Sequence, residues 1–266
     1  MAPLVMNRPV TGRPAPLRRI AFLGQGAIAG RCLPMLLARP ELALGLLVGD
    51  AGLAAQAAYG GATQAADSGA EILPAAERRD GEILERIRSL GIDTLVSVQY
   101  PFILPAAVLE AVNGQAFNLH NAKLPDYRGH NALSHEILNG ERRHTATIHW
   151  MQPRVDTGFV AFEETVEIAP DETAWSLYQK AVPACCALFA RLVAALAGDA
   201  DLPRIEIAGD GPFYSREIAS FKRIADPASL EEIDRKARAF HFPPHEPAYL
   251  ERDGRRLYVV PVWQKP

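Results

Sequence analysis

The fold is decided by a stretch near the N-terminus, Arg19-Ile20-Ala21-Phe22-Leu23 followed by Gly24-Gln25-Gly26-Ala27-Ile28-Ala29-Gly30. The apolar run predicts a short β-strand, and the glycines let that strand turn tightly into a helix that packs closely on it. Leucines continue the helical spacing at positions 33, 36 and 37, and the helix is expected to end near Pro40. A strand that leads directly into a helix is the repeating unit of an α/β sheet.

The same alternation continues along the first half of the chain. Nearly continuous apolar runs at 44–48 and 94–98 predict parallel strands that are buried on both faces, and 71–74 predicts a shorter strand. An amphipathic helix is expected from Glu82 to Leu90, a short helix is expected after Pro105, and residues 51–66 are ambiguous. The sequence therefore predicts an open, Rossmann-like α/β sheet, mostly parallel, with helices on both faces.

The second half predicts a helix over 130–138, strands over 145–150 and 160–168, and a long helix with Asp171 as its N-cap. The composition changes after Gly198, where a helix over 230–240 and a β-hairpin around Asp253-Gly254 are expected. We therefore expect a flexible leader (1–18), a main catalytic domain (19–200) and a small C-terminal extension with a helix and a hairpin (201–266).

The bulk composition excludes several classes of protein. The net charge of −3 argues against broad, sequence-independent nucleic-acid binding. No apolar run reaches the roughly 18 residues of a membrane span, and the leader lacks the apolar core of a secretory signal. The three cysteines are odd in number and lack metal-type spacing, so we expect a cytoplasmic protein without a membrane partner or a metal.

The chemistry is indicated by Phe117-Asn118-Leu119-His120, an apolar run that ends in two polar side chains. Side chains alternate along a strand, so Asn118 and His120 point to one face at a strand end, where ligands collect in such sheets. Asp156 follows in a Val-Asp-Thr-Gly turn and is a candidate to orient or charge-balance the imidazole. An amide donor, an imidazole and a carboxylate are the groups needed to pass an acyl group to an amine.

Each group has a definable role in such a transfer. Asn118 is expected to donate to the developing oxyanion, a contact whose loss typically costs about 10²–10³ in rate. His120 is expected to add a donor or to remove a proton, and loss of a general base typically costs about 10²–10⁴. Asp156 is expected to hold the imidazole and stabilise its cation, and whether His120 or Asp156 finally accepts the proton stays open.

The motif Asn-x-His is followed at once by Lys123-Leu124-Pro125 and Tyr127-Arg128-Gly129, with the Asp-Thr-Gly turn 36 residues after the histidine. This pattern resembles the folate-dependent formyltransferases over roughly residues 19–200, and most specifically over 117–158. The resemblance implies that Asn118, His120 and Asp156 form the catalytic triad. The family commonly has Ser-Leu-Leu-Pro after the histidine where this chain has Ala122-Lys123-Leu124-Pro125, so a contact through that serine hydroxyl is in doubt.

The resemblance also implies the ligands. The formyl donor would be N10-formyltetrahydrofolate, lying against Tyr100, Phe102, Ile103, Leu104, Arg154 and Val155. Two segments are most similar to the formyltransferases of nucleotide-linked amino sugars: Asn121 to Asn131, and Phe242-Pro243-Pro244-His245. We therefore expect the acceptor to be the primary amine of such a sugar, in lipopolysaccharide or O-antigen assembly, with contacts from Lys123, Tyr127, Arg128 and Asn131. The nucleotide (dTDP, GDP or UDP) and a homodimer stay open.

Alternatives come from different classes of protein. Gly24-x-Gly26-x-x-x-Gly30 with Asp50 is one residue away from a dinucleotide-binding fingerprint, which makes a nicotinamide-dependent oxidoreductase the rival hypothesis. A formyltransferase acting on another small amine, and a non-catalytic module that binds folate or sugar nucleotide, are the others.

Overall fold

The computed structural model describes residues 18–54, 70–75 and 79–261. The predicted leader lies outside these residues except for Arg18. The ambiguous segment 51–66 lies outside them beyond residue 54, and residues 51–54 are helical.

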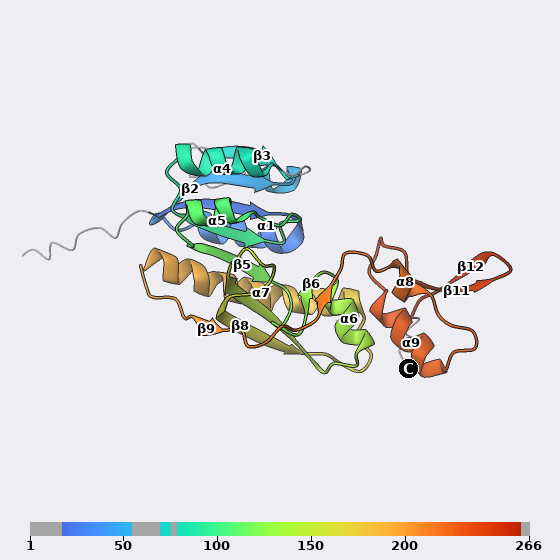
Figure 1. Cartoon of the computed structure of the whole chain (residues 1–266). Helices are drawn as coiled ribbons and strands as arrows, with labels where there is room; N and C mark the ends of the chain where they lie inside the picture. Colours follow the sequence, from blue (N-terminus) through green and yellow to red (C-terminus); the bar gives the residue numbers. More distant parts are fainter. Residues whose placement is uncertain (1–17, 55–69, 76–78, 262–266) are drawn as a thin grey trace, which may run out of the picture.

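A single large sheet organises the described chain, with strand order β3-β2-β1-β4-β5-β7-β8-β9. The first five strands in this order are parallel to one another, and β7, β8 and β9 continue the sheet in antiparallel fashion. The predicted open, mostly parallel sheet is confirmed (Figure 1). The strands are β1 (Arg18–Gly24), β2 (Leu42–Gly49), β3 (Glu71–Pro74), β4 (Thr94–Val98), β5 (Ala116–His120), β7 (Arg143–Trp150), β8 (Phe159–Glu167) and β9 (Ile205–Glu206).

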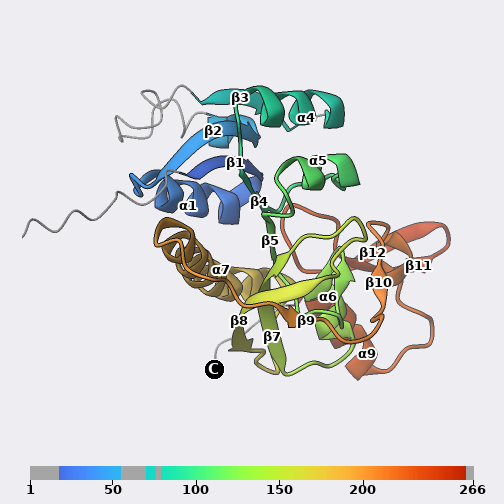
Figure 2. The same cartoon turned by 60° about the vertical axis from the view of Figure 1, so that its left-hand side comes forward.

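Two helical layers cover the two faces of this sheet, as expected (Figure 2). Ile20 and Phe22 of β1 pack in the same core cluster as α1 (Gly26–Leu37) and α7 (Ala174–Ala197). The alternate residues Ala21 and Leu23 pack in a second cluster with α4 (Asp80–Ser89) and α5 (Ala106–Ala111). Because side chains alternate along β1, this strand contributes to two separate cores, one on each face of the sheet.

The long helix α7 begins later than predicted. Asp171 is not its N-cap, because the Thr173 hydroxyl accepts from Ser176 N and the Ser176 hydroxyl accepts from Thr173 N, both at 3.0 Å, which makes a capping box. By length and apolar composition alone α7 could cross a membrane, which the sequence did not lead us to expect. In this fold its apolar side packs on β7, β8 and α1, as a core helix does.

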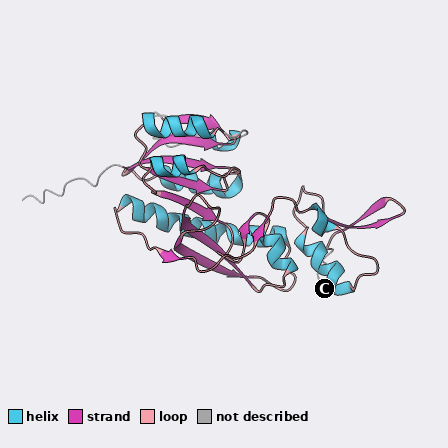
Figure 3. Ribbon diagram, in the orientation of Figure 1, coloured by secondary structure: helices cyan, strands magenta, loops and turns pink. Residues whose placement is uncertain are grey.

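The remaining elements gather beside one end of the sheet (Figure 3). A third core cluster joins α6 (Ala132–Leu138) to the C-terminal segment through Ile137, Ile224, Phe240 and Ala248. The helix predicted from residue 130 starts at Ala132 because Asn131 has a left-handed backbone, φ 58°. The other elements are β6 (Arg128–Gly129), β10 (Phe213–Tyr214), α8 (Ala219–Lys222), α9 (Leu230–Ala239), β11 (Ala248–Arg252) and β12 (Arg255–Val259).

The predicted hairpin is confirmed, with Asp253 and Gly254 both at positive φ between β11 and β12. The boundary at residue 200 stays a prediction. Beyond it, β9 extends the main sheet and β10 pairs with β6.

The contact between α7 and β1 is expected to contribute strongly to the free energy of unfolding. Phe189 is fully buried with its ring edge-on to Phe22 at 6.1 Å between centroids. Phe189→Ala should lower the free energy of unfolding by about 3–5 kcal/mol in urea titrations, because it removes apolar contacts and leaves a cavity. Leu230→Ala, at a residue 85% exposed, is the control and should change it by less than about 0.5 kcal/mol. Equal effects of the two substitutions would contradict this account of the core.

Candidate active site

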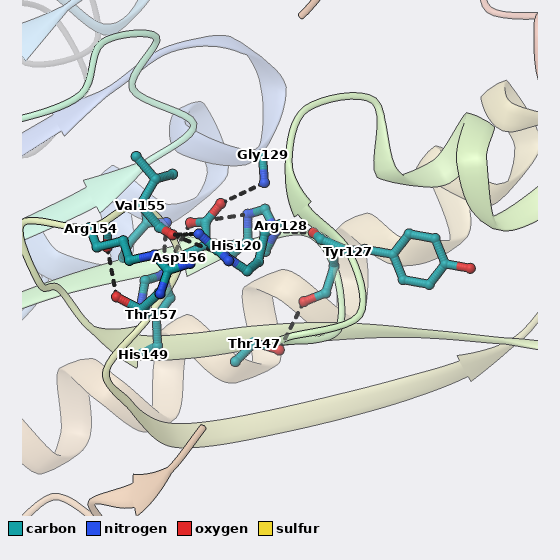
Figure 4. Close-up of polar contacts among 12 residues, drawn as sticks. His120, Tyr127, Arg128, Gly129, Thr147, His149, Arg154, Val155, Asp156 and Thr157 are labelled. Carbon is teal, nitrogen blue, oxygen red and sulfur yellow. Dashed lines mark hydrogen bonds and ion pairs between the residues drawn. The ribbon is translucent and has the colours of Figure 1, made fainter. Parts of the chain in front are cut away.

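Asn118 and His120 lie at the carboxyl end of β5, on the face of the sheet that α4 and α5 cover. Their neighbours Phe117 and Leu119 belong to the opposite core cluster, which fixes this orientation. The antiparallel register places Asn118 opposite His149 and His120 opposite Thr147 of β7. The site therefore brings together side chains from two neighbouring strands of opposite direction (Figure 4).

Asp156 reaches the same point from the turn between β7 and β8. Its backbone is left-handed, φ 51°, and its Oδ2 accepts the N–H of Gly129 at 2.8 Å. Its Oδ1 lies 3.8 Å from His120 Nδ1 and 3.6 Å from His149 Nε2. The structure thus places the three predicted side chains together, with the carboxylate between two imidazoles.

The hydrogen bonds fix which ring nitrogens carry protons. Nε2 of His120 donates to the Tyr127 carbonyl at 2.8 Å, so in the neutral ring the lone pair is on Nδ1, on the Asp156 side. Nδ1 of His149 donates to the Trp150 carbonyl at 3.2 Å, so its Nε2 accepts from Asn118 Nδ2 at 3.2 Å. His149 therefore orients the Asn118 amide.

His149 is absent from the sequence prediction, although a signal for it exists. The strand over 145–150 alternates, so Thr145, Thr147 and His149 share one face. The pairing of this strand with the one that carries Asn118 would have revealed its role. That pairing is a long-range contact which no local pattern encodes.

The local field keeps the carboxylate ionised. Burial alone would raise the pKa of Asp156, but the neighbouring imidazoles, above all His120 in its protonated form, and the N–H of Gly129 together hold it well below its ordinary value. Burial, with Arg216 nearby, lowers the pKa of His130, which also lines the site.

These groups open into a cavity of about 740 Å³ that straddles the end of the sheet. One wall belongs to the α4/α5 face, where Tyr100, Leu104 and Met151 join its core cluster. The opposite wall, with Asn121 and Tyr178, belongs to the α1/α7 face, and it continues into Leu133, Phe240 and Phe242 of the C-terminal cluster. The volume is typical of a site for a small molecule.

The structure places most predicted donor contacts, and one predicted acceptor contact, on this cavity. Those on the cavity are Tyr100, Phe102, Ile103, Leu104, Val155 and Asn131. Arg154 does not line it, because its side chain is exposed and pairs with Asp210 at 2.6 Å.

Lys123, Tyr127 and Arg128 also lie away from the cavity. Lys123 is exposed and pairs with Asp126 at 2.8 Å, and the buried Tyr127 hydroxyl donates to Glu141 at 2.8 Å. The Arg128 guanidinium is buried and donates to the carbonyls of Val155 and Gly211. In the structure, Arg128 thus joins loops around the site.

Two cations that line the cavity were not predicted, Arg216 and Lys222. Arg216 donates to the Pro101 carbonyl at 2.6 Å and so ties the C-terminal segment to the donor wall. Both residues lie in a segment of weak periodicity, far in sequence from the motif, so only the tertiary structure reveals them.

The glycine loop does not support a dinucleotide site. Oδ2 of Asp50 accepts the N–H of Gly26 at 2.9 Å, and Oδ1 accepts the N–H of Leu53 at 2.9 Å. A carboxylate therefore already occupies the donor at the start of α1 that a phosphate would need. These hydrogen bonds lower the pKa of Asp50, against the opposing effect of burial. Within the described ranges, no group of three or more His, Cys, Asp or Glu side chains could hold a metal ion.

Comparison with known proteins fits this site. Residues 50–191 match the formyl transferase family. GDP-perosamine N-formyltransferase of Brucella melitensis is 32% identical over 171 residues, 64% of this chain and 65% of that protein. Methionyl-tRNA formyltransferase of Parvibaculum lavamentivorans is 35% identical over 183 residues, 67% of this chain and 57% of that protein. The chain thus spans less than two thirds of the length of either relative.

Solved structures share the fold at low sequence identity. A 4-N formyltransferase from Francisella tularensis superposes with a TM-score of 0.75 at 18% identity, over 94% of this chain and all of that one. An N-formyltransferase from Helicobacter canadensis, solved with folinic acid and dTDP-3-aminofucose, gives 0.67 at 18% identity over 89% and 85% of the two chains. With the family match covering more than half of its length, the chain belongs to the formyltransferase family.

Proposed function

We propose that this protein transfers the formyl group of N10-formyltetrahydrofolate to the primary amine of a nucleotide-linked amino deoxysugar. The observation that carries the proposal is the convergence of Asn118, His120 and Asp156 at one point in a two-walled cavity. The similarity to a GDP-perosamine N-formyltransferase and to a structure holding folinic acid and dTDP-3-aminofucose supports it.

The donor is assigned to the wall on the α4/α5 face. Tyr100, Phe102 and Leu104 give this wall an aromatic and apolar surface suited to a flat pterin, with Tyr100 and Phe102 edge-on at 5.6 Å. Asn118 and His120 project from the same face of the sheet, so a formyl group carried by a donor on this wall lies beside them.

The acceptor then approaches from the opposite wall and the C-terminal segment. Arg216 and Lys222 are cations on the cavity that could pair with a diphosphate, which for Lys222 would replace Glu246, 3.8 Å away. The net charge of −3 gives no support for a tRNA acceptor, although some relatives are methionyl-tRNA formyltransferases. This geometry favours a small phosphorylated acceptor.

The chemistry follows from the proton positions. The amine nitrogen forms a bond to the formyl carbon, and the carbonyl π electrons move onto oxygen. Nδ1 of His120 takes a proton from that nitrogen and becomes an imidazolium, which the ionised Asp156 stabilises. The oxyanion then re-forms the carbonyl and the C–N10 bond breaks, with its electron pair returning to N10. The His120 imidazolium gives its proton to N10, and the formamide is released.

Asn118 stabilises the oxyanion formed in the first step. One of its two amide N–H groups donates to His149, which leaves the second for the oxygen. Because His149 accepts at Nε2, it holds the NH₂ group of this amide toward the reacting carbonyl.

We further propose that the reaction takes place in the cytoplasm, in the assembly of lipopolysaccharide or O-antigen. A homodimer is one option for the oligomeric state of the protein.

The acceptor can be identified by the products formed from a mixed panel. Incubation with N10-formyltetrahydrofolate and GDP-perosamine, dTDP-3-aminofucose and a UDP-linked amino sugar should convert one of them to a product about 28 Da heavier. Mass spectrometry measures this directly. No mass gain in any amino sugar, with formylation of another small amine instead, would contradict the proposed acceptor.

The triad can be tested by substitution. Asn118→Ala should lower kcat by about 10²–10³, because one oxyanion donor is lost, and His120→Asn by about 10²–10⁴, because the base is lost. His241→Asn, at a histidine that does not line the cavity, is the matched control and should keep full activity. Turnover near that of the unchanged enzyme in both triad variants would exclude these roles.

The ionisation of Asp156 predicts an acid-side loss of stability. A folded-state pKa below the unfolded value of about 3.9 contributes stability that is fully present above that pH and is lost as pH falls through the folded pKa. The difference in unfolding free energy between the unchanged protein and Asp156→Asn, taken at pH 5, should shrink by on the order of 2 kcal/mol as the pH falls below about 4. Urea titrations at each pH measure it, with the exposed Asp210→Asn as control. A difference that does not change with pH would refute the assignment.

A further inference from the structure

The residue after His120 belongs to a buried polar network that the reaction described above does not use. Asn121 lines the cavity, and its Oδ1 lies 3.0 Å from His144 Nε2 and 3.1 Å from Cys185 Sγ. His144 Nδ1 lies 2.8 Å from Glu136 Oε2. Glu136, His144 and Cys185 are essentially inaccessible to solvent, and they come from α6, β7 and α7.

The partners determine the direction of every hydrogen bond in this network. A carboxylate accepts, so Nδ1 of His144 donates to Glu136. An amide oxygen also accepts, so Nε2 of His144 and the Cys185 thiol both donate to Asn121. Both nitrogens of His144 therefore donate, Nδ1 to the buried carboxylate and Nε2 to the amide oxygen. The Nε2 N–H fixes the amide of Asn121 with the oxygen inward.

The amide nitrogen of Asn121 is thereby presented to the cavity. In the part of the chain that the structure covers, no hydrogen bond to this Nδ2 is found, and the atom is not sealed from solvent. A buried ion pair adds little stability in comparison with apolar packing. The cost of burying Glu136 and His144 is therefore better explained by the orientation they impose.

We propose that Asn121 is a specificity-determining residue that donates an N–H to the hydroxyl beside the amine of the acceptor sugar. Glu136, His144 and Cys185 act as positioning residues for it. The inference rests on the proposed function, because it takes an amino sugar as the acceptor.

The position of Asn121 identifies the atom that it contacts. Its side chain turns to the α1/α7 face, where Cys185 lies, whereas His120 projects from the opposite face, on which the donor wall is built. An amine beside His120 thus places the rest of the acceptor against Asn121. Because His120 and Asn121 are adjacent in the chain and both line the cavity, we place this contact on the part of the sugar ring next to the reacting nitrogen.

The test uses the nucleotide-linked amino sugar that gives the highest kcat/KM in the panel described above. Three forms of this sugar are compared. In these forms the neighbouring hydroxyl is present, replaced with fluorine or replaced with hydrogen. Fluorine accepts a hydrogen bond weakly and cannot donate one. The unchanged enzyme should prefer the hydroxyl form over the deoxy form by about tenfold in kcat/KM, with the fluoro form between them.

Asn121→Ala should bring the three values of kcat/KM within about twofold of one another, mainly through KM for the hydroxyl form. Gln115→Ala removes an amide side chain outside the main cavity, so it is the matched control and should keep the preference. Thermal melting of each variant checks that it is folded.

Glu136→Gln tests the positioning role with an isosteric change. A glutamine can accept from Nδ1 of His144 through its oxygen or donate to it through its NH₂ group, so Nε2 is no longer held as a donor and the amide of Asn121 is no longer fixed in one orientation. The fluoro form should then fall toward the deoxy form relative to the hydroxyl form, a change that a merely structural role would not produce.

The outcomes separate the two proposals. Turnover with unchanged preferences in both Asn121→Ala and Glu136→Gln overturns this inference and leaves the proposed function intact. No formylation of any panel member by the unchanged enzyme overturns both.

Discussion

The site depends on the turn that holds Asp156 against the Arg128-Gly129 segment. Asp156 is one of the few non-glycine residues at positive φ, a conformation that needs support from its surroundings. Arg128 donates to the Val155 carbonyl and Gly129 donates to the Asp156 carboxylate. Gly129 itself has φ 92°, and a Cβ there would lie 2.2 Å from the Tyr214 carbonyl oxygen. Gly129 is thus required by backbone geometry and Arg128 by its hydrogen bonds, and through Gly129 the C-terminal segment supports the carboxylate.

The change of strand direction after β5 brings the supported carboxylate to the catalytic strand. Parallel strands alone would place Asn118 and His120 at an open edge, as in many α/β proteins. The antiparallel β7 instead brings His149 beside Asn118 and then leads into the turn with Asp156. The strand β7 and the turn after it therefore place the His149 imidazole and the Asp156 carboxylate at the same point. The acidic group is buried there without loss of its charge because two imidazoles and a backbone N–H surround it.

Local patterns were sufficient for the sheet and for the residues of the motif, because strand alternation and Asn-x-His are encoded within a few residues. They failed where a contact joins distant segments. Arg128 was predicted to contact the acceptor, yet its Nε, Nη1 and Nη2 each donate to a carbonyl of a loop that only tertiary folding brings near. His149, Arg216 and Lys222 were missed for the same reason. The N-cap at Asp171 was wrong because the reciprocal bonds of Thr173 and Ser176 satisfy the first turn better than a residue two positions earlier.

Two asparagines flank the reaction, and a histidine orients each of them in the opposite sense. His149 donates through Nδ1 to a neutral carbonyl, so its Nε2 accepts and draws the NH₂ group of Asn118 toward it. His144 instead donates through Nδ1 to a buried carboxylate and through Nε2 to the oxygen of Asn121, which turns inward. A histidine–asparagine pair thus presents different amide groups to the cavity on the two faces. The difference follows from the group that accepts the Nδ1 proton of each histidine. In the proposed reaction, the amides on the two faces of the sheet therefore serve different parts of one acyl transfer.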